Sequence, residues 1–183
     1  MAWLATRQGK LTGVVFSGGE ACLQAEALLP VLKAVKQLGF AIKLDTNGSL
    51  PHALKTLVRS GCVDTVAMDV KAPLHRYNEI AGCAVNTCEV HESLQLLNAY
   101  AQESDNNFAF ETRTTVIPSL LSQVDILAMV PLLQASPRHY LQAFVPEHTA
   151  SRTLRSLPPT SNKRLLAFQH LLRDQGIPAH CRF

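Results

Sequence analysis

The feature that most constrains this chain is a regular alternation of short apolar runs with segments of helical periodicity. The runs are rich in β-branched and aromatic residues, and turn residues or proline follow most of them. They lie at 13–16, 40–45, 63–70, 108–117 and 140–145. The segments between them carry apolar residues three and four positions apart, which is typical of a helix with one buried face. About five repeats of strand then helix predict parallel βα units, arranged as an open doubly wound sheet or as an arc of a barrel.

Local start and stop signals support the helices of this pattern. Pro51 and Gly61 bracket one segment with proline first and glycine last, the order expected of a helix. Ser122 and Asp125 form a capping-box pattern before an apolar run. Proline lacks the amide hydrogen that the later turns of a helix need. We therefore expect the helix after the first strand to hold Pro30 in its first turn.

Composition indicates a chain that folds around one core. The 183 residues are 47% hydrophobic and 17% charged, the reverse of the balance found in disordered chains. We expect a single domain over residues 1–183, with no membrane span and no signal peptide, because no apolar run is long enough. The five cysteines are an odd number at irregular spacing, which favours a reduced, cytoplasmic setting over a disulfide framework.

Charge is distributed unevenly along the chain. Residues 138–183 carry seven Lys or Arg against two Asp or Glu, whereas residues 1–137 are slightly acidic. A nucleic-acid platform would combine such charge with a stripe of aromatic residues, and the sequence has no such stripe. We therefore interpret the basic part as a solvated face and expect no nucleic-acid partner.

Polar residues gather where the first two strands end, at the edge where parallel βα folds bind ligands. The first strand runs into Ser17 to Glu20, whose two glycines open the backbone to a ligand and whose carboxylate suits an ammonium group. A tight turn before a helix would explain the same residues. The second strand ends in Asp45 to Gly48, which offers oxygen ligands but is also common turn chemistry.

Charged residues lie within the third and fourth strands. Asp69 and Lys71 are two positions apart and so point to one face of the third strand, and Arg113 lies in the fourth. Charges in apolar strands are costly unless they are paired or bind a ligand. An internal Asp–Lys pair and a ligand site are therefore both open at this point.

Four polar strand ends in a row favour one ligand site over four separate structural explanations. The set suits a zwitterionic amino-acid group, because the Glu20 carboxylate would meet its ammonium. Lys71 or Arg113 would meet its carboxylate, and Asp45 or Asn47 would hold hydroxyl groups. This chemistry describes a ligand but does not name a reaction.

Four motifs in order resemble the radical S-adenosylmethionine (SAM) family. They are FSGGE at 16–20, KLDTNG at 43–48, VAMDVKAP at 66–73 and RTTVIP at 113–118. The chain is most similar to the activating proteins of anaerobic ribonucleoside-triphosphate reductase, which are relatives of pyruvate formate-lyase activating enzyme. The similarity runs from about Thr12 to Phe183, nearly the whole chain.

The resemblance implies a partial (β/α) barrel and a reaction. A [4Fe–4S] cluster would bind SAM and split it reductively to a 5′-deoxyadenosyl radical, which would generate a glycyl radical on a partner enzyme such as anaerobic ribonucleotide reductase. An electron donor such as flavodoxin or ferredoxin would supply the electron. The expected setting is the cytoplasm, away from membranes.

The resemblance also implies roles for individual residues. Gly18, Gly19 and Glu20 would hold the amino group of SAM, and four residues would lie along its ribose and carboxylate. These four are Asp45, Asn47, Lys71 and Arg113. As in the related activating enzymes, a monovalent cation would bind at Asp45, Thr46 and Asp69.

Two departures from the family pattern stand out. Ala21 replaces the proline that usually follows the Gly-Gly-Glu motif, which loosens the turn without abolishing binding. The cluster-binding pattern Cys-x-x-x-Cys-x-x-Cys is missing, and the cysteines present do not reproduce it. They are Cys22, Cys62, Cys83, Cys88 and Cys181. The segment 1–11 resembles what precedes the family's second strand, so we expect the first βα unit and its cysteine loop to lie outside this chain, which alone would be inactive.

Two other functions are open. One is a non-catalytic module that binds SAM, another nucleotide or an acidic partner. The other is a βα enzyme that uses Asp45 and Asp69 with Mg²⁺, since carboxylates at strand ends suit hard cations. The second leaves Glu20, Lys71 and Arg113 without a role. The absence of the first unit would also leave the strand at 13–16 as an exposed edge, with marginal stability as the expected consequence.

Overall fold

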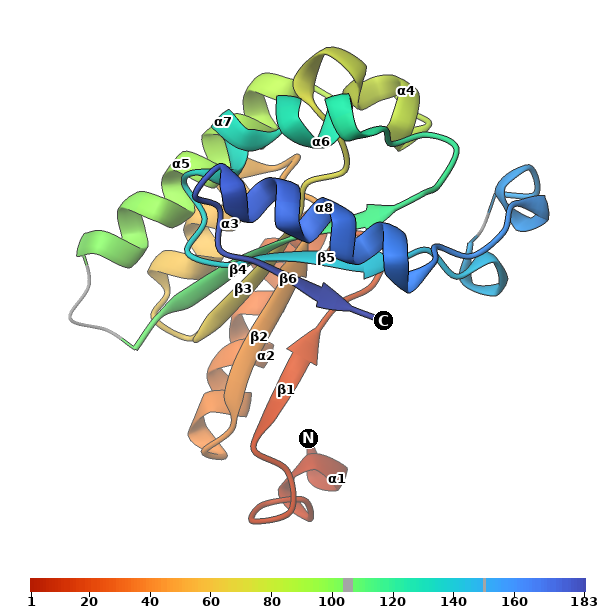
Figure 1. The fold of residues 1–183 in the computed structure, drawn as a ribbon. Helices are drawn as coiled ribbons and strands as arrows, with labels where there is room; N and C mark the ends of the chain where they lie inside the picture. Colours follow the sequence, from red (N-terminus) through yellow and green to blue (C-terminus); the bar gives the residue numbers. More distant parts are fainter. Residues whose placement is uncertain (104–106, 150) are drawn as a thin grey trace. The chain divides into compact units, whose positions relative to one another are not determined.

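The structure, a computed structural model, describes residues 1–103, 107–149 and 151–183. Six strands form a parallel sheet whose order follows the chain from β1 to β6 (Figure 1). The strands are β1 (Gly13–Phe16), β2 (Ala41–Thr46), β3 (Thr65–Asp69), β4 (Ala109–Val116), β5 (His139–Ala143) and β6 (Ala179–Arg182). The predicted α/β architecture of parallel strands and intervening helices is confirmed.

One helix precedes β1, and the others occupy the connections between consecutive strands. The α-helices are α1 (Ala2–Ala5), α2 (Ala25–Gln37), α3 (Pro51–Arg59), α4 (Tyr77–Ala81), α5 (Thr87–Glu103), α6 (Gln123–Ala128), α7 (Val130–Leu133) and α8 (Asn162–Asp174). Short 3-10 helices are η1 (Ala21–Gln24), η2 (Leu74–Arg76), η3 (Pro146–His148) and η4 (Leu154–Ser156). Among the described residues, no helix is long and apolar enough to cross a membrane.

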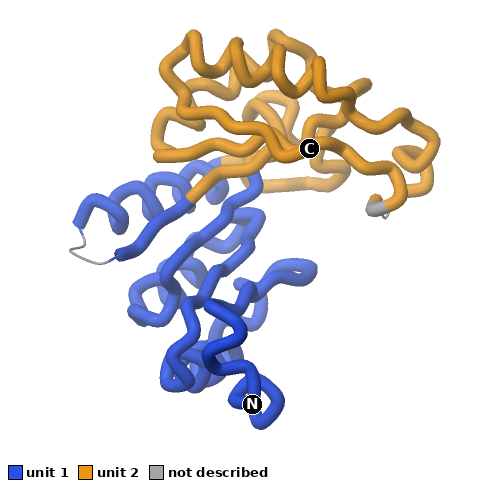
Figure 2. Tube along the Cα trace, turned by 60° about the horizontal axis from the view of Figure 1, so that its bottom comes forward, with its two compact units in different colours: residues 1–69, 88–110 blue, residues 70–87, 111–183 orange. Residues whose placement is uncertain are grey.

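The chain divides into two compact units, which we describe separately (Figure 2). Unit 1 comprises residues 1–69 and 88–110. Within it β1 pairs in parallel with β2, and β2 with β3, so that Val15 lies opposite Lys43 and Asp45 opposite Ala67. Because side chains alternate along a strand, one face of this sheet is apolar and packs on helices, and the other carries the charged residues.

The core of unit 1 lies between β2 and the helices. Ile42 and Leu44 of β2 are fully buried, as are Leu32 of α2 and Leu54 of α3. Helix α2 packs against both α3 and β2. This packing orients the end of β2, which carries Asp45 to Gly48, with respect to the loop after β1.

Unit 2 comprises residues 70–87 and 111–183. Here β4 pairs in parallel with β5, and β5 with β6, so that Arg113 lies opposite Tyr140 and Tyr140 opposite His180. Helix α8 runs along β5 and β6 (Figure 1) and buries Leu165 and Leu172. The predicted capping box is present, because the side chains of Ser122 and Asp125 each accept from the other's backbone N–H.

The structure corrects one helix. Pro30 lies inside α2, which begins at Ala25, so the expectation of a first-turn proline is wrong. The missing amide hydrogen leaves the carbonyl of Glu26 without its intrahelical donor. Both residues are exposed, so water is able to satisfy that carbonyl at low cost. The periodicity therefore continues through the proline.

Strands β1 and β6 lie at the two ends of the strand order. Strand β6 was missed, because it is four residues long and half of it is polar (His180 and Arg182). Strand β1 lies at the other end of the strand order, as expected for an edge, and the Val15 side chain is 57% exposed. The expected loss of stability stays a prediction.

Candidate ligand site

The centre of the candidate site is the Glu20 carboxylate in unit 1. Glu20 follows β1 in an extended conformation and caps η1, with Cys22 N donating to Glu20 Oε1 at 3.1 Å. Thr46 Oγ1 donates to the same oxygen at 2.8 Å, and Asn47 N donates to Oε2 at 2.7 Å. Three neutral donors thus hold a negative charge between the ends of two neighbouring strands.

The two glycines before Glu20 leave open space. Gly18 has a backbone φ of 145°, a conformation that residues with a side chain rarely adopt. A Cβ added at Gly18 or Gly19 would meet no atom within 4 Å. Both residues are exposed. The peptide groups of this loop are therefore accessible to a ligand that also reaches Glu20.

The turn after β2 is fixed by a dense set of hydrogen bonds. Gly48 N donates to Thr46 Oγ1 at 3.1 Å, and Ser49 N donates to the Asn47 side-chain oxygen at 2.9 Å. The hydroxyl of Ser93 on α5 donates to the Gly48 carbonyl at 2.8 Å. A Cβ on Gly48 would stand 2.0 Å from Met68 Cε, so glycine is required there. The turn chemistry predicted for this segment and its place beside Glu20 both hold.

Asp45 and Asp69 lie on the charged face of the unit 1 sheet, at the ends of β2 and β3. Both are partly buried. Among the described residues, no group of three or more His, Cys, Asp or Glu side chains is placed to hold a metal ion. The cation site expected at Asp45, Thr46 and Asp69 stays a prediction, since it includes a threonine and only two carboxylates.

Unit 2 contains the other two predicted residues, Lys71 and Arg113. The segment at Val70 is joined to β4, because Val70 N donates to the Arg113 carbonyl at 2.8 Å and Thr114 Oγ1 donates to the Val70 carbonyl. Lys71 N donates to the hydroxyl of the buried Tyr77 at 3.2 Å. These bonds fix the backbone of Val70 and the amide of Lys71.

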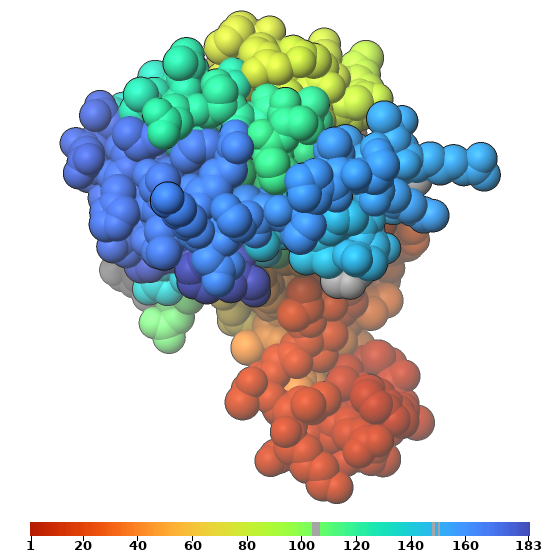
Figure 3. Space-filling model, turned by 45° about the vertical axis from the view of Figure 1, so that its right-hand side comes forward, coloured from red at the N-terminus to blue at the C-terminus, as the bar shows by residue number. Residues whose placement is uncertain are grey.

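A cavity of about 470 Å³ lies beside Lys71 within unit 2. Thr115 of β4 and Gln142 of β5 line it, and η4 contributes Leu154. The light-blue segment that includes η4 projects from the rest of unit 2 at the right of Figure 3. Thr160 ties the returning chain to the sheet, because it donates to the Val116 carbonyl and accepts from Phe144 N. The cavity has the size of a small-molecule pocket.

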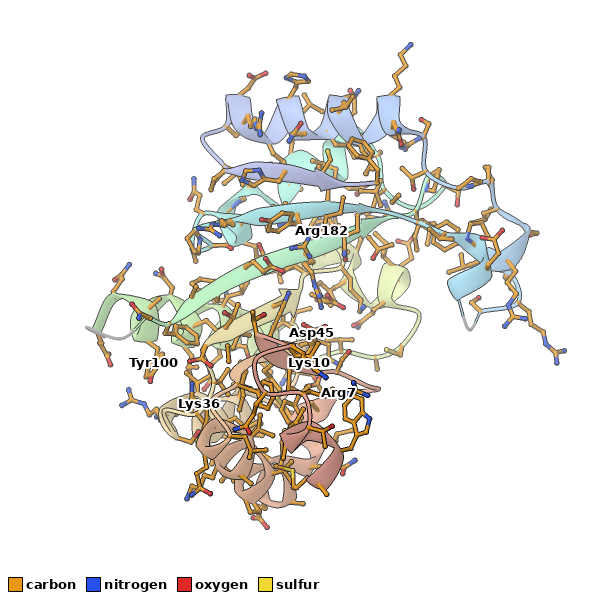
Figure 4. All side chains as sticks on the ribbon, turned by 90° about the horizontal axis from the view of Figure 1, so that it is seen from below. Arg7, Lys10, Lys36, Asp45, Tyr100 and Arg182 are labelled. Atoms are coloured by element: carbon orange, nitrogen blue, oxygen red, sulfur yellow. The ribbon has the colours of Figure 1, made fainter. Side chains whose placement is uncertain are left out.

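A polar cluster that was not predicted from the sequence lies on the sheet face of unit 2 that also carries Arg113. The Arg182 guanidinium, labelled in Figure 4, bonds both oxygens of Glu111 at 2.9 and 3.0 Å and lies 3.7 Å from the centre of the Tyr140 ring. The rings of Tyr140 and His180 stack at 5.3 Å. The alternation along β4 and β5 places Glu111 and Tyr140 on one face, but Arg182 could be found only with β6 in place.

The structure thus groups the predicted residues in two sets. Unit 1 brings together the loop with Gly18, Gly19 and Glu20 and the turn with Asn47, and Asp45 precedes that turn. Unit 2 holds Lys71 and Arg113 in neighbouring segments. The TNG turn motif marked Thr46 as a turn residue. It could not predict the hydrogen bond of Thr46 to Glu20, because the two residues are 26 positions apart in the chain.

The cysteines do not form a cluster site in the part of the chain described. Cys22 and Cys62 are buried, Cys83 and Cys88 are exposed, and within the described structure none of the five cysteines forms a disulfide. Burial raises the pKa of the Cys22 thiol to about 12, so it stays protonated near neutral pH. A [4Fe–4S] cluster needs three or four thiolates in one place, and the described residues do not fit one.

The fold is shared with known structures. The structure superposes on a domain of pyruvate-formate lyase-activating enzyme from Bacteroides vulgatus with a TM-score of 0.71 and 19% identity, over 94% of this chain and 100% of that chain. It also superposes on TYW1 with a lysine-pyruvate adduct bound, with a TM-score of 0.63 and 19% identity, over 94% of this chain and 56% of that one. The expected partial-barrel fold is confirmed.

Sequence similarity points to a narrower group. The chain is 29% identical over 151 residues to the putative glycyl-radical enzyme activating enzyme MJ1227 of Methanocaldococcus jannaschii, which covers 82% of this chain. The chain spans 62% of the length of that curated relative. No protein-family model matches the chain. Sequence and fold together support a relationship with radical SAM activating enzymes, and the subgroup acting on anaerobic ribonucleotide reductase stays a prediction.

Proposed function

We propose that this chain is the SAM-binding part of a radical SAM activating protein for a glycyl-radical enzyme such as anaerobic ribonucleoside-triphosphate reductase. The observation that carries the proposal is the Glu20 carboxylate, which three neutral donors hold beside two open glycines. A charge held only by neutral donors is able to attract a cationic ligand group, and the ammonium of SAM is such a group.

The proposed contacts divide between the two units. In unit 1, Gly18, Gly19 and Glu20 bind the amino group, and Asp45 and Asn47 bind ribose hydroxyls. In unit 2, Lys71 and Arg113 bind the carboxylate; their segments are neighbours, because Val70 N donates to the Arg113 carbonyl. Asp45, Thr46 and Asp69 form the proposed monovalent-cation site.

The cluster chemistry is proposed for a longer form of the protein. In enzymes of this class a [4Fe–4S] cluster supplies the electron that splits SAM. The described residues offer it no ligand set. We propose that the cluster, an electron donor such as flavodoxin or ferredoxin, and the glycine-bearing partner all act with the longer form, in the cytoplasm.

A second candidate follows from the cysteines. Since the five thiols are scattered over the described structure, the chain by itself suits a non-catalytic module that binds SAM or another nucleotide. The two candidates share the Glu20 site and differ in radical chemistry. A longer form with three clustered cysteines, reconstituted under argon, would yield 5′-deoxyadenosine from SAM only if the enzyme candidate is right.

The test of the shared site is a binding measurement. Calorimetry or equilibrium dialysis of SAM against the 183-residue chain is expected to show that Glu20→Gln weakens binding about tenfold or more, which is at least ~1.4 kcal/mol. Glu26→Gln is the matched control, because Glu26 is exposed in the first turn of α2. Equal affinity of Glu20→Gln and the native chain would rule out the proposed site.

A further inference from the structure

We infer that Thr46 is a positioning residue whose hydroxyl orients the Glu20 carboxylate, so that Glu20 Oε2 is the oxygen that receives the ligand's ammonium group. The inference rests on the proposed function and sharpens it. It assigns the selection of an aminated ligand to one oxygen atom and to the side chain that holds it in place.

The hydrogen bonds around Thr46 Oγ1 show which group accepts the hydroxyl hydrogen. The hydroxyl has one hydrogen to donate and two lone pairs. Gly48 N donates its own hydrogen to Oγ1, at 3.1 Å. Cys22 Sγ lies 3.5 Å away, and its buried, protonated thiol is able to donate to the second lone pair. The hydroxyl hydrogen therefore goes to Glu20 Oε1, at 2.8 Å.

The inventory of the carboxylate identifies the oxygen that is left for a ligand. An ionised carboxylate has about four lone-pair sites, two on each oxygen. Oε1 accepts from Thr46 Oγ1 and from Cys22 N, so both of its sites are used. Oε2 accepts from Asn47 N at 2.7 Å, which leaves one site. One N–H of an ammonium group fills that site.

The sheet makes this arrangement rigid. Thr46 is the last residue of β2, lies opposite Met68 in β3 and is 4% exposed. Glu20, in contrast, lies in the loop between β1 and η1. The hydroxyl of Thr46 and the N–H of Asn47 come from consecutive residues and bind one carboxylate oxygen each, so together they fix the plane of the carboxylate. Without the hydroxyl, Oε1 gains an open site and the side chain is able to rotate.

This role is separate from the cation-ligand role that the resemblance implies for Thr46. Removal of the hydroxyl is expected to change ligand discrimination if Thr46 positions Glu20, and to change a sodium or potassium dependence if the hydroxyl itself binds a cation.

The test measures discrimination between two ligands. The 183-residue chain is titrated with SAM and with its desamino analogue, in which hydrogen replaces the α-amino group. The native chain is expected to prefer SAM about tenfold or more, and Thr46→Val is expected to reduce this preference about fivefold while the analogue binds as before. Thr46→Ser, which keeps the hydroxyl, is expected to restore the native preference.

Each outcome decides the inference. A native preference in Thr46→Val, an equal loss of both ligands, or a failure of Thr46→Ser to rescue overturns it and leaves the proposed function intact. A native chain that binds neither ligand, or does not discriminate, overturns the proposed function and this inference with it. Thr46→Ala removes the same hydroxyl with less crowding and replaces the valine variant if that variant does not fold.

A double-mutant cycle adds a second readout. In a Glu20→Gln background the hydroxyl of Thr46 has no carboxylate to orient, so Thr46→Val is expected to leave the SAM preference unchanged. An additional loss of preference in that background shows that Thr46 acts without Glu20 and contradicts the inference.

Discussion

One glutamate follows a strand of unit 1, another lies within a strand of unit 2, and the two carboxylates are held in opposite ways. In unit 1, one hydroxyl and two backbone amides hold the Glu20 carboxylate. In unit 2, the Arg182 guanidinium binds both oxygens of Glu111 and compensates its charge. Neutral donors orient a carboxylate and leave its charge for a ligand, whereas a bidentate arginine commits the same group to structure. The partner, and not the residue type, decides the role.

The largest expected effect is a loss of unfolding free energy at acidic pH, caused by His139 in unit 2. Burial lowers the pKa of His139 to about 3, from an ordinary value of 6.5, and its Nδ1 pairs with Thr112 Oγ1 at 2.9 Å. The folded chain keeps this ring neutral while the unfolded chain protonates it, so stability falls as the pH drops below about 6.5 and continues to fall towards 3. The expected slope is about 1.4 kcal/mol per pH unit from this residue.

Urea unfolding at several pH values measures that slope. His139→Gln is expected to show a shallower fall between pH 6 and 4 than the native chain, and His170→Gln, at an exposed position on α8, is expected to follow the native chain. An identical pH dependence in His139→Gln would contradict the assignment of acid sensitivity to this ring.

The second largest expected effect tests the ion pair between Glu111 and Arg182. Arg182→Ala removes the guanidinium that binds both oxygens of the largely buried Glu111 and is expected to cost about 2 kcal/mol of unfolding free energy. Adding Glu111→Gln to that variant is expected to recover part of the loss, since the buried side chain then carries no charge. Thermal and urea unfolding measure both. Arg152→Ala, at an exposed site, is the control, and an equal cost there would break the comparison.

The smallest effect on stability belongs to the open loop of unit 1. Gly19→Ala is expected to change the unfolding free energy by less than about 0.5 kcal/mol, because its Cβ meets no atom within 4 Å. The same methyl group would stand where the ligand approaches, so SAM affinity is expected to fall about tenfold. Calorimetry and urea unfolding of one variant give both numbers. A stability loss without a binding loss would make the loop structural.

Local patterns predicted much of this protein, for physical reasons that particular residues show. The run at 13–16 and the turn at 45–48 follow from side-chain alternation and turn residues, which act over a few positions. The prediction of a first-turn proline at Pro30 was wrong, because an exposed carbonyl tolerates the loss of its amide donor. Strand β6 is short and half polar, so its pattern is weak, and it forms because α8 and β5 provide the surface on which it packs.

The amino-acid sequence alone determined the order of the first five strands and the polar residues at the strand ends, because both depend on spacing within a few residues. Only the tertiary structure decided which oxygen of Glu20 is open and that Arg182 neutralises Glu111, 71 positions away. Those facts depend on hydrogen bonds between segments that are distant in the chain. The geometry of such bonds exists only once the sheet has brought the segments together.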